Sequence, residues 1–312
     1  MVKIGIPKAL LYHKYRVLWE TFFKELDCEV VYSPDTNQEI MRKGISLAVD
    51  ESCLSMKIFL GHVAWLKDKV DYIFIPRIIR LHKKEQTCVK LWALYDITNN
   101  SIEGIDKKLI SYTVDTKEWK FEWFELFKFG FKFNKNPIKI LLSVGKAMRA
   151  QDKHCEQLLA EQVKGLSQKK EDAPSVLVVS HPYTTYDAML GAPIIKFLRE
   201  QNVHVLFAEI VKHEDARELS KNISTDLHWT YNKEIIGAIE VYRKNIDGIL
   251  FLMTFPCGPD SLVIDLCQKK ISDVPVVVVT LDELQGEAGL KTRLEIFADI
   301  LKMKKKRKLT SK

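Results

Sequence analysis

The sequence lacks both the long apolar run of a membrane-spanning helix and the leader of an exported protein. A spanning helix needs about 18 or more apolar residues in succession, and the chain has no such run. The opening residues MVKIGIPKALLYHKY do not contain the apolar core of a signal peptide. We therefore expect a cytoplasmic protein without a membrane partner, whose cysteines stay reduced.

Several sequence motifs with a defined chemistry are also missing. No Gly-x-Gly-x-x-Gly follows the first expected strand, where the turn reads Gly5-Ile6-Pro7-Lys8, and no Walker A sequence occurs. The chain contains no CxxC, HExxH or GxSxG motif. These absences argue against a dinucleotide or P-loop nucleotide site, a compact zinc site and a hydrolase of the nucleophile-elbow type.

What the chain does contain is an ordinary globular composition with an uneven charge. Of its 312 residues, 46% are hydrophobic and 29% are charged, and this length suggests two domains. Much of the net charge of +7 comes from one basic segment. Its cations are Lys302, Lys304, Lys305, Lys306, Arg307, Lys308 and Lys312. This segment is either a tail for nucleic acid or a membrane surface, or a solvated, frayed end. We favour the frayed end, because blocks of like charge are usually disordered, and we expect no nucleic-acid partner.

Short apolar runs alternate with helical patterns, which is typical of βαβ units with parallel strands. Expected strands cover residues 2–6, 29–33, 72–75, 108–113, 176–180, 203–208, 248–253 and 274–280. Expected helices cover residues 9–26, 37–48, 54–67, 187–201, 233–243, 260–269 and 289–304. The valine-rich runs 176–180 and 274–280 predict strands covered on both faces. The predicted fold class is α/β, with two Rossmann-like lobes of mainly parallel sheet.

A helical segment is expected to join the two lobes. An aromatic-rich stretch, 119–133, and a long helical pattern, 138–168, separate the two sets of strands. We divide the chain into an N-terminal lobe (1–117), a helical bridge (118–170) and a C-terminal lobe (171–312). Because open α/β sheets bind ligands at the carboxyl ends of their strands, the crevice between the lobes is the expected site.

The positions of the six cysteines single out three of them. Cys53 begins an apolar helical stretch, where backbone N–H groups and the helix dipole stabilise a thiolate. Cys88 lies in a polar loop beyond the third strand, and Cys257 lies in a turn of Pro and Gly after strand 248–253. All three therefore fall on the carboxyl side of the strands. We expect the others to be structural thiols: Cys28, Cys155 and Cys267.

Spacing alone leaves the role of these three thiols open. The interval of 35 residues from 53 to 88 and that of 169 residues from 88 to 257 match no compact metal motif. Shared metal ligation is therefore one hypothesis, with buried thiols and nucleophiles as the alternatives.

Polar residues beside two of these cysteines are further candidates. They are Glu51 and Ser52 before Cys53, and Gly258, Asp260 and Ser261 after Cys257. We expect them to hydrogen-bond a cofactor or substrate, or to cap helices, and the two roles are compatible. Glu51 is also a candidate catalytic carboxylate.

Two further pairs of residues follow expected strands. His181 and Tyr183 come after strand 176–180, and we expect them to donate protons to a substrate or to form a structural pair. Glu287 and Arg293 lie in the stretch GEAGLKTR as candidate cofactor-binding residues. Arg293 is expected to bind a carboxylate or a CoA phosphate, or to form a salt bridge between the lobes.

Several segments resemble one protein family over nearly the whole chain. KIGIPKALLYHKY, DESCLSMKIFLGHV and DYIFIPR resemble the N-terminal region of proteins related to acyl-CoA dehydratase activases, the DUF2229 group. HPYTTYDAMLG, DGILFLMTFPCGPDSLV and LDELQGEAGLKTRLEIF resemble the later part of the same group. The group is similar in turn to the iron–sulfur subunits of 2-hydroxyacyl-CoA dehydratases and to double-cubane-cluster proteins.

This resemblance implies an iron–sulfur cluster ligated by Cys53, Cys88 and Cys257. Three protein ligands suit a [4Fe–4S] cluster with one iron open to a substrate oxygen, or part of an [8Fe–9S] double-cubane cluster. A separate ATP-dependent activase would supply a low-potential electron to a dehydratase or reductase that acts on an acyl-CoA or a small molecule. The implied alternative is a non-catalytic electron-transfer or scaffold subunit.

The resemblance also implies partners and reveals departures. Expected partners are the activase, a second dehydratase-like subunit, and a second copy of the chain in a homodimer. Relatives often carry a histidine where this chain has Leu284, which puts a proton-transfer role at that position in doubt. The sequence has no activase-type ATPase region, so we expect no nucleotide hydrolysis.

Overall fold

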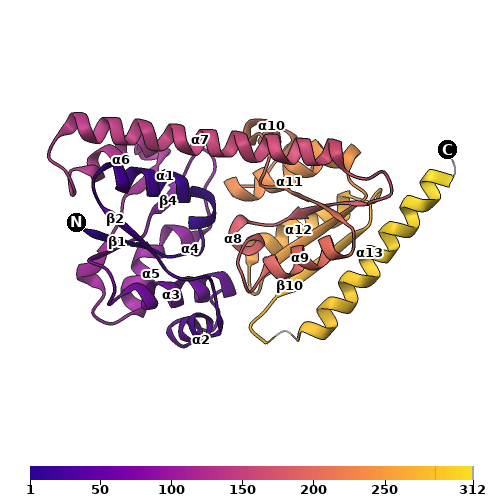
Figure 1. The fold of residues 1–312 in the computed structure, drawn as a ribbon, viewed down its shortest axis with the longest axis horizontal. Coiled ribbons are helices and arrows are strands. Elements are labelled where there is room, and N and C mark those ends of the chain that lie inside the picture. Colours follow the sequence, from indigo (N-terminus) through magenta and orange to yellow (C-terminus); the bar gives the residue numbers. More distant parts are fainter. Residues whose placement is uncertain (285, 311–312) are drawn as a thin grey trace. The chain divides into compact units, whose positions relative to one another are not determined.

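The computed structural model describes residues 1–284 and 286–310 (Figure 1). The chain forms two compact units. Unit 1 comprises Met1–Glu156 with His228–Thr230, and unit 2 comprises Gln157–Leu227 with Tyr231–Lys312. The first division falls inside the long helix α7 (Pro137–Gln168). The predicted boundaries at residues 117 and 170 stay predictions.

Unit 1 contains a four-stranded parallel sheet in the order β2-β1-β3-β5. Its strands are β1 (Lys3–Ile6), β2 (Glu29–Tyr32), β3 (Tyr72–Phe74) and β5 (Leu109–Ile110). The central strand β1 buries Ile4 and Ile6 almost completely. Parallel pairing requires a crossover between successive strands, and helices supply it.

Three helices of unit 1, α1, α2 and α3, lie where the apolar periodicity predicted them, and α4, α5 and α6 were not among the expected helices. They are α1 (Tyr12–Glu25), α2 (Gln38–Leu47), α3 (Leu54–Leu66), α4 (Val89–Trp92), α5 (Leu94–Ser101) and α6 (Glu122–Gly130), with one-turn 3-10 helices at Asp106–Lys108 and Thr116–Glu118. Asn37 caps α2, as predicted, because its side chain accepts a hydrogen bond from the Ile40 amide at 3.0 Å. Trp19, Phe23 and Phe74 form the centre of an aromatic core.

Helices α2 and α3 touch backbone to backbone through two glycines. A Cβ atom on Gly44 would lie 1.9 Å from the Lys57 carbonyl oxygen, and one on Gly61 would lie 2.0 Å from the Ile40 carbonyl oxygen. Only glycine permits this approach, because any side chain would occupy the space of the facing helix. The crossing fixes α3 and therefore the position of Cys53 at its start.

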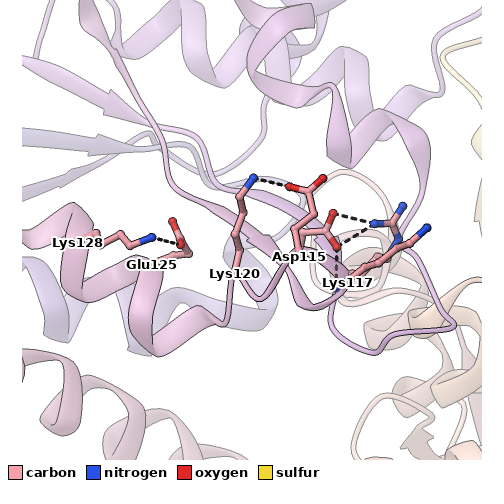
Figure 2. A network of polar contacts seen from close by, with 7 residues as sticks. Asp115, Lys117, Lys120, Glu125 and Lys128 are labelled. Atoms are coloured by element: carbon pink, nitrogen blue, oxygen red, sulfur yellow. Dashed lines mark hydrogen bonds and ion pairs between the residues drawn. The ribbon is translucent and has the colours of Figure 1, made fainter.

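A second, two-stranded sheet pairs β4 (Arg77–Arg80) with β6 (Thr113–Asp115) in unit 1. The single strand predicted at 108–113 is therefore wrong, because the chain divides between two sheets. The interruption between β5 and β6 lies opposite Pro76, which has no N–H to donate to the hydrogen-bond ladder between the strands. Arg80 fixes β6 through two hydrogen bonds, 2.9 and 2.8 Å, to the buried Asp115 carboxylate. Figure 2 shows this pair beside the Lys120 and Lys128 ion pairs.

Unit 2 repeats the strand order of unit 1, and both are Rossmann-like parallel sheets as predicted. Its parallel sheet has the order β10-β9-β7-β8. The strands are β7 (Ser175–Val179), β8 (His204–Phe207), β9 (Gly248–Thr254) and β10 (Val276–Leu281). In each unit the first strand lies between the second and the third, so the chain reverses its winding direction between the first and third strands. The α/β class with mainly parallel sheets is confirmed in both units.

The helices of unit 2 are α8 (Pro182–Thr185), α9 (Gly191–Glu200), α10 (His213–Leu219), α11 (Thr230–Tyr242), α12 (Gly258–Lys270) and α13 (Glu287–Thr310), with 3-10 turns at Ser220–Asn222 and Arg243–Asn245. Helix α9 begins four residues later than predicted. The Asp187 carboxylate accepts hydrogen bonds from the amides of Met189 and Leu190, at 2.9 and 3.2 Å, which forms a turn in place of a helix start.

Two other predictions for unit 2 are wrong. The run at 274–280 forms the edge strand β10, which is half-buried along most of its length and not covered on both faces. The basic segment is helical and not frayed from Lys302 to Lys308, because α13 continues to Thr310, and Lys312 lies outside the described residues. An ion pair of 3.1 Å between Lys305 and Asp247 holds the helix there. In the described part of the chain, no helix combines the length and apolarity needed to cross a membrane.

Replacing Gly61 with alanine should lower the free energy of unfolding by about 2 kcal/mol or more, because the new methyl group overpacks the α2–α3 crossing. Urea unfolding followed by circular dichroism measures the change. Gly145→Ala in α7 is the control, since the nearest atom there would be 3.5 Å from the new Cβ. It should stabilise the chain by up to about 1 kcal/mol through helix propensity. Equal stability of Gly61→Ala and the parent chain would contradict the crossing.

Candidate functional site

The most developed polar site of unit 2 lies where its sheet reverses winding direction. His181 follows β7 directly, and Cys257 follows β9 after a cis Phe255–Pro256 peptide bond. These two strands are neighbours in the sheet. Their carboxyl ends therefore meet at the position where open α/β sheets bind ligands, and the predicted residues His181, Cys257 and Asp260 come together there.

The carboxylate of Asp260 is the centre of this site. Its Oδ1 atom lies 3.0 Å from His181 Nε2 and accepts a hydrogen bond of 2.7 Å from Asn232 Nδ2. A further hydrogen bond joins its carboxylate to the Cys257 side chain. His181, Asn232 and Asp260 are 5%, 4% and 7% exposed, so water does not compete with these bonds. One buried acceptor thus ties together α8, α11 and the turn before α12.

The site keeps Asp260 ionised although it is buried. Burial alone would raise the pKa of this carboxyl group, but the charge of His181 and the hydrogen bonds from His181, Asn232 and Cys257 lower the pKa below its usual value. An ionised Asp260 only accepts hydrogen bonds, so His181 carries its proton on Nε2. Only Nδ1 of this imidazole is then left for any proton transfer.

A small cavity lies on the inner side of Asp260. Its volume is about 10 Å³, and its lining includes Asp260, Asn232 and Ser180. That is the volume of about one water molecule. Ser180 Oγ is buried and has no hydrogen-bond partner among the described residues. The cavity therefore adds a polar interior to the site but no room for an organic substrate.

Two other predicted residues border this cluster. The Tyr183 ring stacks on the His181 ring, with centroids 5.0 Å apart and planes at 18°. Ser261 Oγ donates a hydrogen bond of 2.7 Å to the Cys257 carbonyl oxygen. This is the bond that a helical serine makes back to the carbonyl group four residues earlier. Ser261 therefore fixes the backbone of the Cys257 turn.

In unit 1 the segments around Cys53 and Cys88 lie side by side. Lys90 Nζ donates a hydrogen bond of 3.4 Å to the Glu51 carbonyl oxygen, two residues before Cys53. Ser52 is buried and its amide bonds the Val49 carbonyl oxygen, whereas the Glu51 side chain is exposed. One turn after Cys53, Lys57 is 6% exposed on α3.

The three singled-out cysteines share one structural position. Cys53, Cys88 and Cys257 are the N-cap residues of α3, α4 and α12, and each side chain is partly exposed. The other cysteines lack this setting: burial raises the pKa of Cys28 to about 11 and of Cys267 to about 12, and Cys155 lies on the exposed surface of α7. The three cysteines that the sequence singled out are therefore the three that occupy helix N-cap positions.

Three glycines near the strand ends of unit 2 face open space. A Cβ atom on Gly258, Gly286 or Gly289 would have no neighbour within 4 Å. Local packing does not require glycine there, so these positions leave room for a close approach from outside. Arg293, one turn after Gly289, donates a hydrogen bond of 2.6 Å to the Val278 carbonyl oxygen of β10. Glu287 begins α13, and its side chain lies outside the described part of the chain.

Sequence reasoning missed a second polar network, in unit 1. His62 is fully buried, with Nδ1 2.8 Å from Ser33 Oγ and Nε2 2.9 Å from Thr36 Oγ1. The Lys8 amide donates a further bond of 2.9 Å to Ser33 Oγ. Burial lowers the pKa of His62 to about 3, so the ring is neutral. Ser33 follows β2, so the strand-end rule that singled out His181 would also have found it.

Asn232 is the other missed residue. Its signal is an amide near the start of α11, where asparagine is a poor helix former unless it has a partner. Within the described residues, no group of three or more His, Cys, Asp or Glu side chains is arranged to hold a metal ion. Cys53 and Cys88 belong to unit 1 and Cys257 belongs to unit 2, so neither unit alone carries all three thiols.

A comparison with protein families identifies the chain. The model described as "CoA enzyme activase uncharacterised domain (DUF2229)" matches residues 3–211. The chain belongs to the DUF2229 family. The resemblance inferred from the sequence motifs is therefore confirmed, and the match spans all of β1 to β8. A search of curated proteins finds no match for this DUF2229 chain.

Several solved structures align with the DUF2229 chain at low similarity. One is a cadmium-bound periplasmic metal binding protein from Candidatus Liberibacter asiaticus, with 11% identity, a TM-score of 0.29, and coverage of 96% of this chain and 99% of that one. Others are the laminin-binding protein Lbp of Streptococcus pyogenes (12%, 0.27, 96% and 98%) and the AdcAII protein of Streptococcus pneumoniae (9%, 0.29, 96% and 98%). TM-scores this low support no statement about this chain.

Asp260→Ala should lower the free energy of unfolding of unit 2 by about 3 kcal/mol or more, because buried donors on His181 and Asn232 lose their acceptor. Thermal and urea unfolding measure the loss. Asp265→Ala on the same helix is the matched control, since Asp265 is exposed and pairs with Lys269 at the surface. We expect a change of about 0.5 kcal/mol or less for the control. Equal effects of the two variants would show that the Asp260 network does not stabilise the unit.

Unit 1 should become less stable on acidification because of His62. Below pH 6.5 the unfolded chain binds a proton at this histidine, but the folded chain does not until about pH 3. Stability is therefore lost as the pH falls, by about 2 kcal/mol between pH 7 and pH 5. His62→Gln should remove this part of the slope in urea titrations and leave the part due to His13, whose pKa burial lowers to about 4, whereas His228→Gln, at an exposed position of the same unit, should retain the whole slope. An unchanged slope in His62→Gln would contradict the assignment.

Proposed function

We propose that this DUF2229 chain is the iron–sulfur component of a 2-hydroxyacyl-CoA dehydratase-like or double-cubane-type system, reduced by a separate ATP-dependent activase. The family membership supports a role in CoA enzyme activation systems. The observation that carries the proposal is the common position of Cys53, Cys88 and Cys257 as N-cap residues of three helices. Buried thiols that bind no ligand would have no reason to share the N-cap position.

The donor set fits an iron–sulfur cluster chemically. Cluster ligands are thiolates, and a helix N-terminus stabilises negative charge through its N–H groups and dipole. Cys53, Cys88 and Cys257 would hold a [4Fe–4S] cluster, or part of an [8Fe–9S] cluster. When bound, the group would supply low-potential electron transfer and an iron site for a substrate oxygen.

The chain's own residues would orient and protect that site. Asp260 holds the Cys257 side chain by a hydrogen bond, and Asn232 and His181 hold Asp260. Ser52, Ser261 and the open glycine Gly258 would bring polar groups and backbone close to the cluster. His181 would exchange protons through Nδ1, because Nε2 bonds Asp260. Tyr183 would support that ring by stacking, and Glu51 would act as an exposed carboxylate.

A non-catalytic electron-transfer subunit is the second candidate. The cavity beside Asp260 has a volume of about 10 Å³, which admits about one water molecule and no acyl-CoA. A protein that only transfers electrons needs no substrate pocket beside its cluster ligand. Arg293, the candidate for a CoA phosphate, bonds a backbone carbonyl of its own unit, which also favours this alternative.

Anaerobically purified full-length chain should contain iron and acid-labile sulfide and should give an electron paramagnetic resonance signal after reduction. Cys53→Ala, Cys88→Ala and Cys257→Ala should each lose most of the iron, because each removes one thiolate. Cys155→Ala, at an exposed helical position, is the control and should keep it. Full iron content in all three N-cap variants would exclude the ligand assignment.

The two candidate functions are separated by turnover. The iron-loaded chain is mixed with an activase, ATP and a 2-hydroxyacyl-CoA, with and without a second dehydratase-like subunit. Substrate dehydration by this chain supports the enzyme, whereas reduction of the cluster without turnover supports the electron-transfer subunit. A chain that binds iron but accepts no electron from the activase would exclude both.

A further inference from the structure

Helix α13 carries apolar side chains on two opposite faces. Leu294, Phe297, Ala298 and Leu301 are buried, and Phe297 and Leu301 pack against Gly248 at the start of β9. An α-helix has 3.6 residues per turn. Apolar residues at spacings of four and three therefore also form a stripe along the opposite side of α13. Its residues are Ile296, Ile300 and Met303, which are 57%, 41% and 56% exposed. A helix that only covers a sheet needs the first face and not the second.

The cations of α13 divide between the two faces. Between residues 300 and 310 the helix has six cationic side chains and no acidic one, and the exposed Asp299 just before them pairs with Lys302 at 3.7 Å. Lys302 and Lys305 bond groups of unit 2 itself, at 3.3 Å from Gln201 Oε1 and 3.1 Å from Asp247 Oδ2. These two cations fasten the helix to its unit. Lys304 and Lys306 are exposed on either side of the apolar stripe, and Arg307 continues it.

We call Ile296, Ile300, Met303, Lys304, Lys306 and Arg307 the outward face of α13, the helix that Figure 1 labels near the C-terminus. We propose that the outward face of α13 binds membrane surfaces that contain anionic lipids. Such a helix lies in the plane of the interface, with its apolar stripe among the acyl chains and its lysines at the phosphates. Clusters of lysine and arginine on an amphipathic helix are the usual signature of this contact.

The composition of the face favours a lipid surface over other anionic partners. Nucleic acid would bond the cations but would leave the Ile296–Ile300–Met303 stripe in water, and the face has no aromatic side chain on which a base could stack. Protein interfaces are depleted in lysine and enriched in aromatic residues, the reverse of this face. A fluid layer of anionic headgroups above acyl chains satisfies both the charges and the stripe.

Helix formation is what creates this surface. In a frayed segment the same residues would point in all directions, and the sequence alone therefore led us to expect no membrane partner. Once α13 is fixed by Lys305 and Asp247, the three apolar side chains and the flanking lysines share one side. The proposal does not depend on the iron–sulfur function, because none of its residues is a candidate ligand.

The full-length chain is tested by co-sedimentation with two kinds of vesicle, phosphatidylcholine alone and equal parts of phosphatidylcholine and phosphatidylglycerol. We expect binding to the anionic vesicles, weakened by salt because the attraction is electrostatic. Lys304→Gln combined with Lys306→Gln should weaken this binding on the order of 25-fold, at roughly fivefold per charge. Ile296→Ser combined with Met303→Ser should weaken it while leaving the net charge unchanged.

The matched control removes two exposed lysines elsewhere on unit 2. Lys196→Gln with Lys269→Gln makes the same change in net charge on α9 and α12, and it should bind the anionic vesicles like the parent chain. Equal weakening in this control, equal binding to both kinds of vesicle, or binding of a nucleic acid through Lys304 and Lys306 without vesicle binding would each overturn the proposal. Unchanged thermal unfolding verifies that every variant is folded.

Discussion

The buried carboxylate of Asp260 is the interaction on which the candidate site depends. Two segments that are distant in the sequence donate to it, His181 after β7 and Asn232 in α11, and Cys257 donates from three residues earlier in the same turn. An ionised carboxylate is stable inside a protein only if several donors surround it. Asp260 therefore ties the turn that carries Cys257 to the rest of unit 2. In unit 1 the neutral ring of His62 has a similar role, because it joins Ser33 and Thr36 by hydrogen bonds.

Much of the fold was predictable because its signals are local. Apolar runs bounded by Pro, Gly and polar residues located nearly every strand, and periodicity located α1, α3 and α7 within a few residues. The N-cap position of Cys53 followed from the polar residues before an apolar helical stretch, and the turn position of Cys257 followed from the Pro and Gly around it. The presence of two parallel sheets followed from the alternation of strands and helices.

What could not be predicted depends on neighbours in space. Whether a valine run is central or at an edge is decided by which strands pair with it, so β10 was placed wrongly. The end of α13 depends on Asp247, some sixty positions earlier, which neutralises one of its lysines. The role of Asn232 could not be predicted from the sequence, because its partner Asp260 belongs to a different helix. The backbone contact of α2 with α3 is likewise invisible until Gly44 and Gly61 face each other.

The half-buried edge strand β10 has a consequence for how the chain behaves among its own copies. An exposed row of valine backbone groups is a template for adding a foreign strand, which is how sheets aggregate. Arg293 Nη2 bonds the carbonyl oxygen of Val278 at the middle of that row. A bulky, charged guanidinium at this acceptor interrupts strand addition at its central register. Arg293 thus occupies one of the backbone acceptors that an added strand would need on β10.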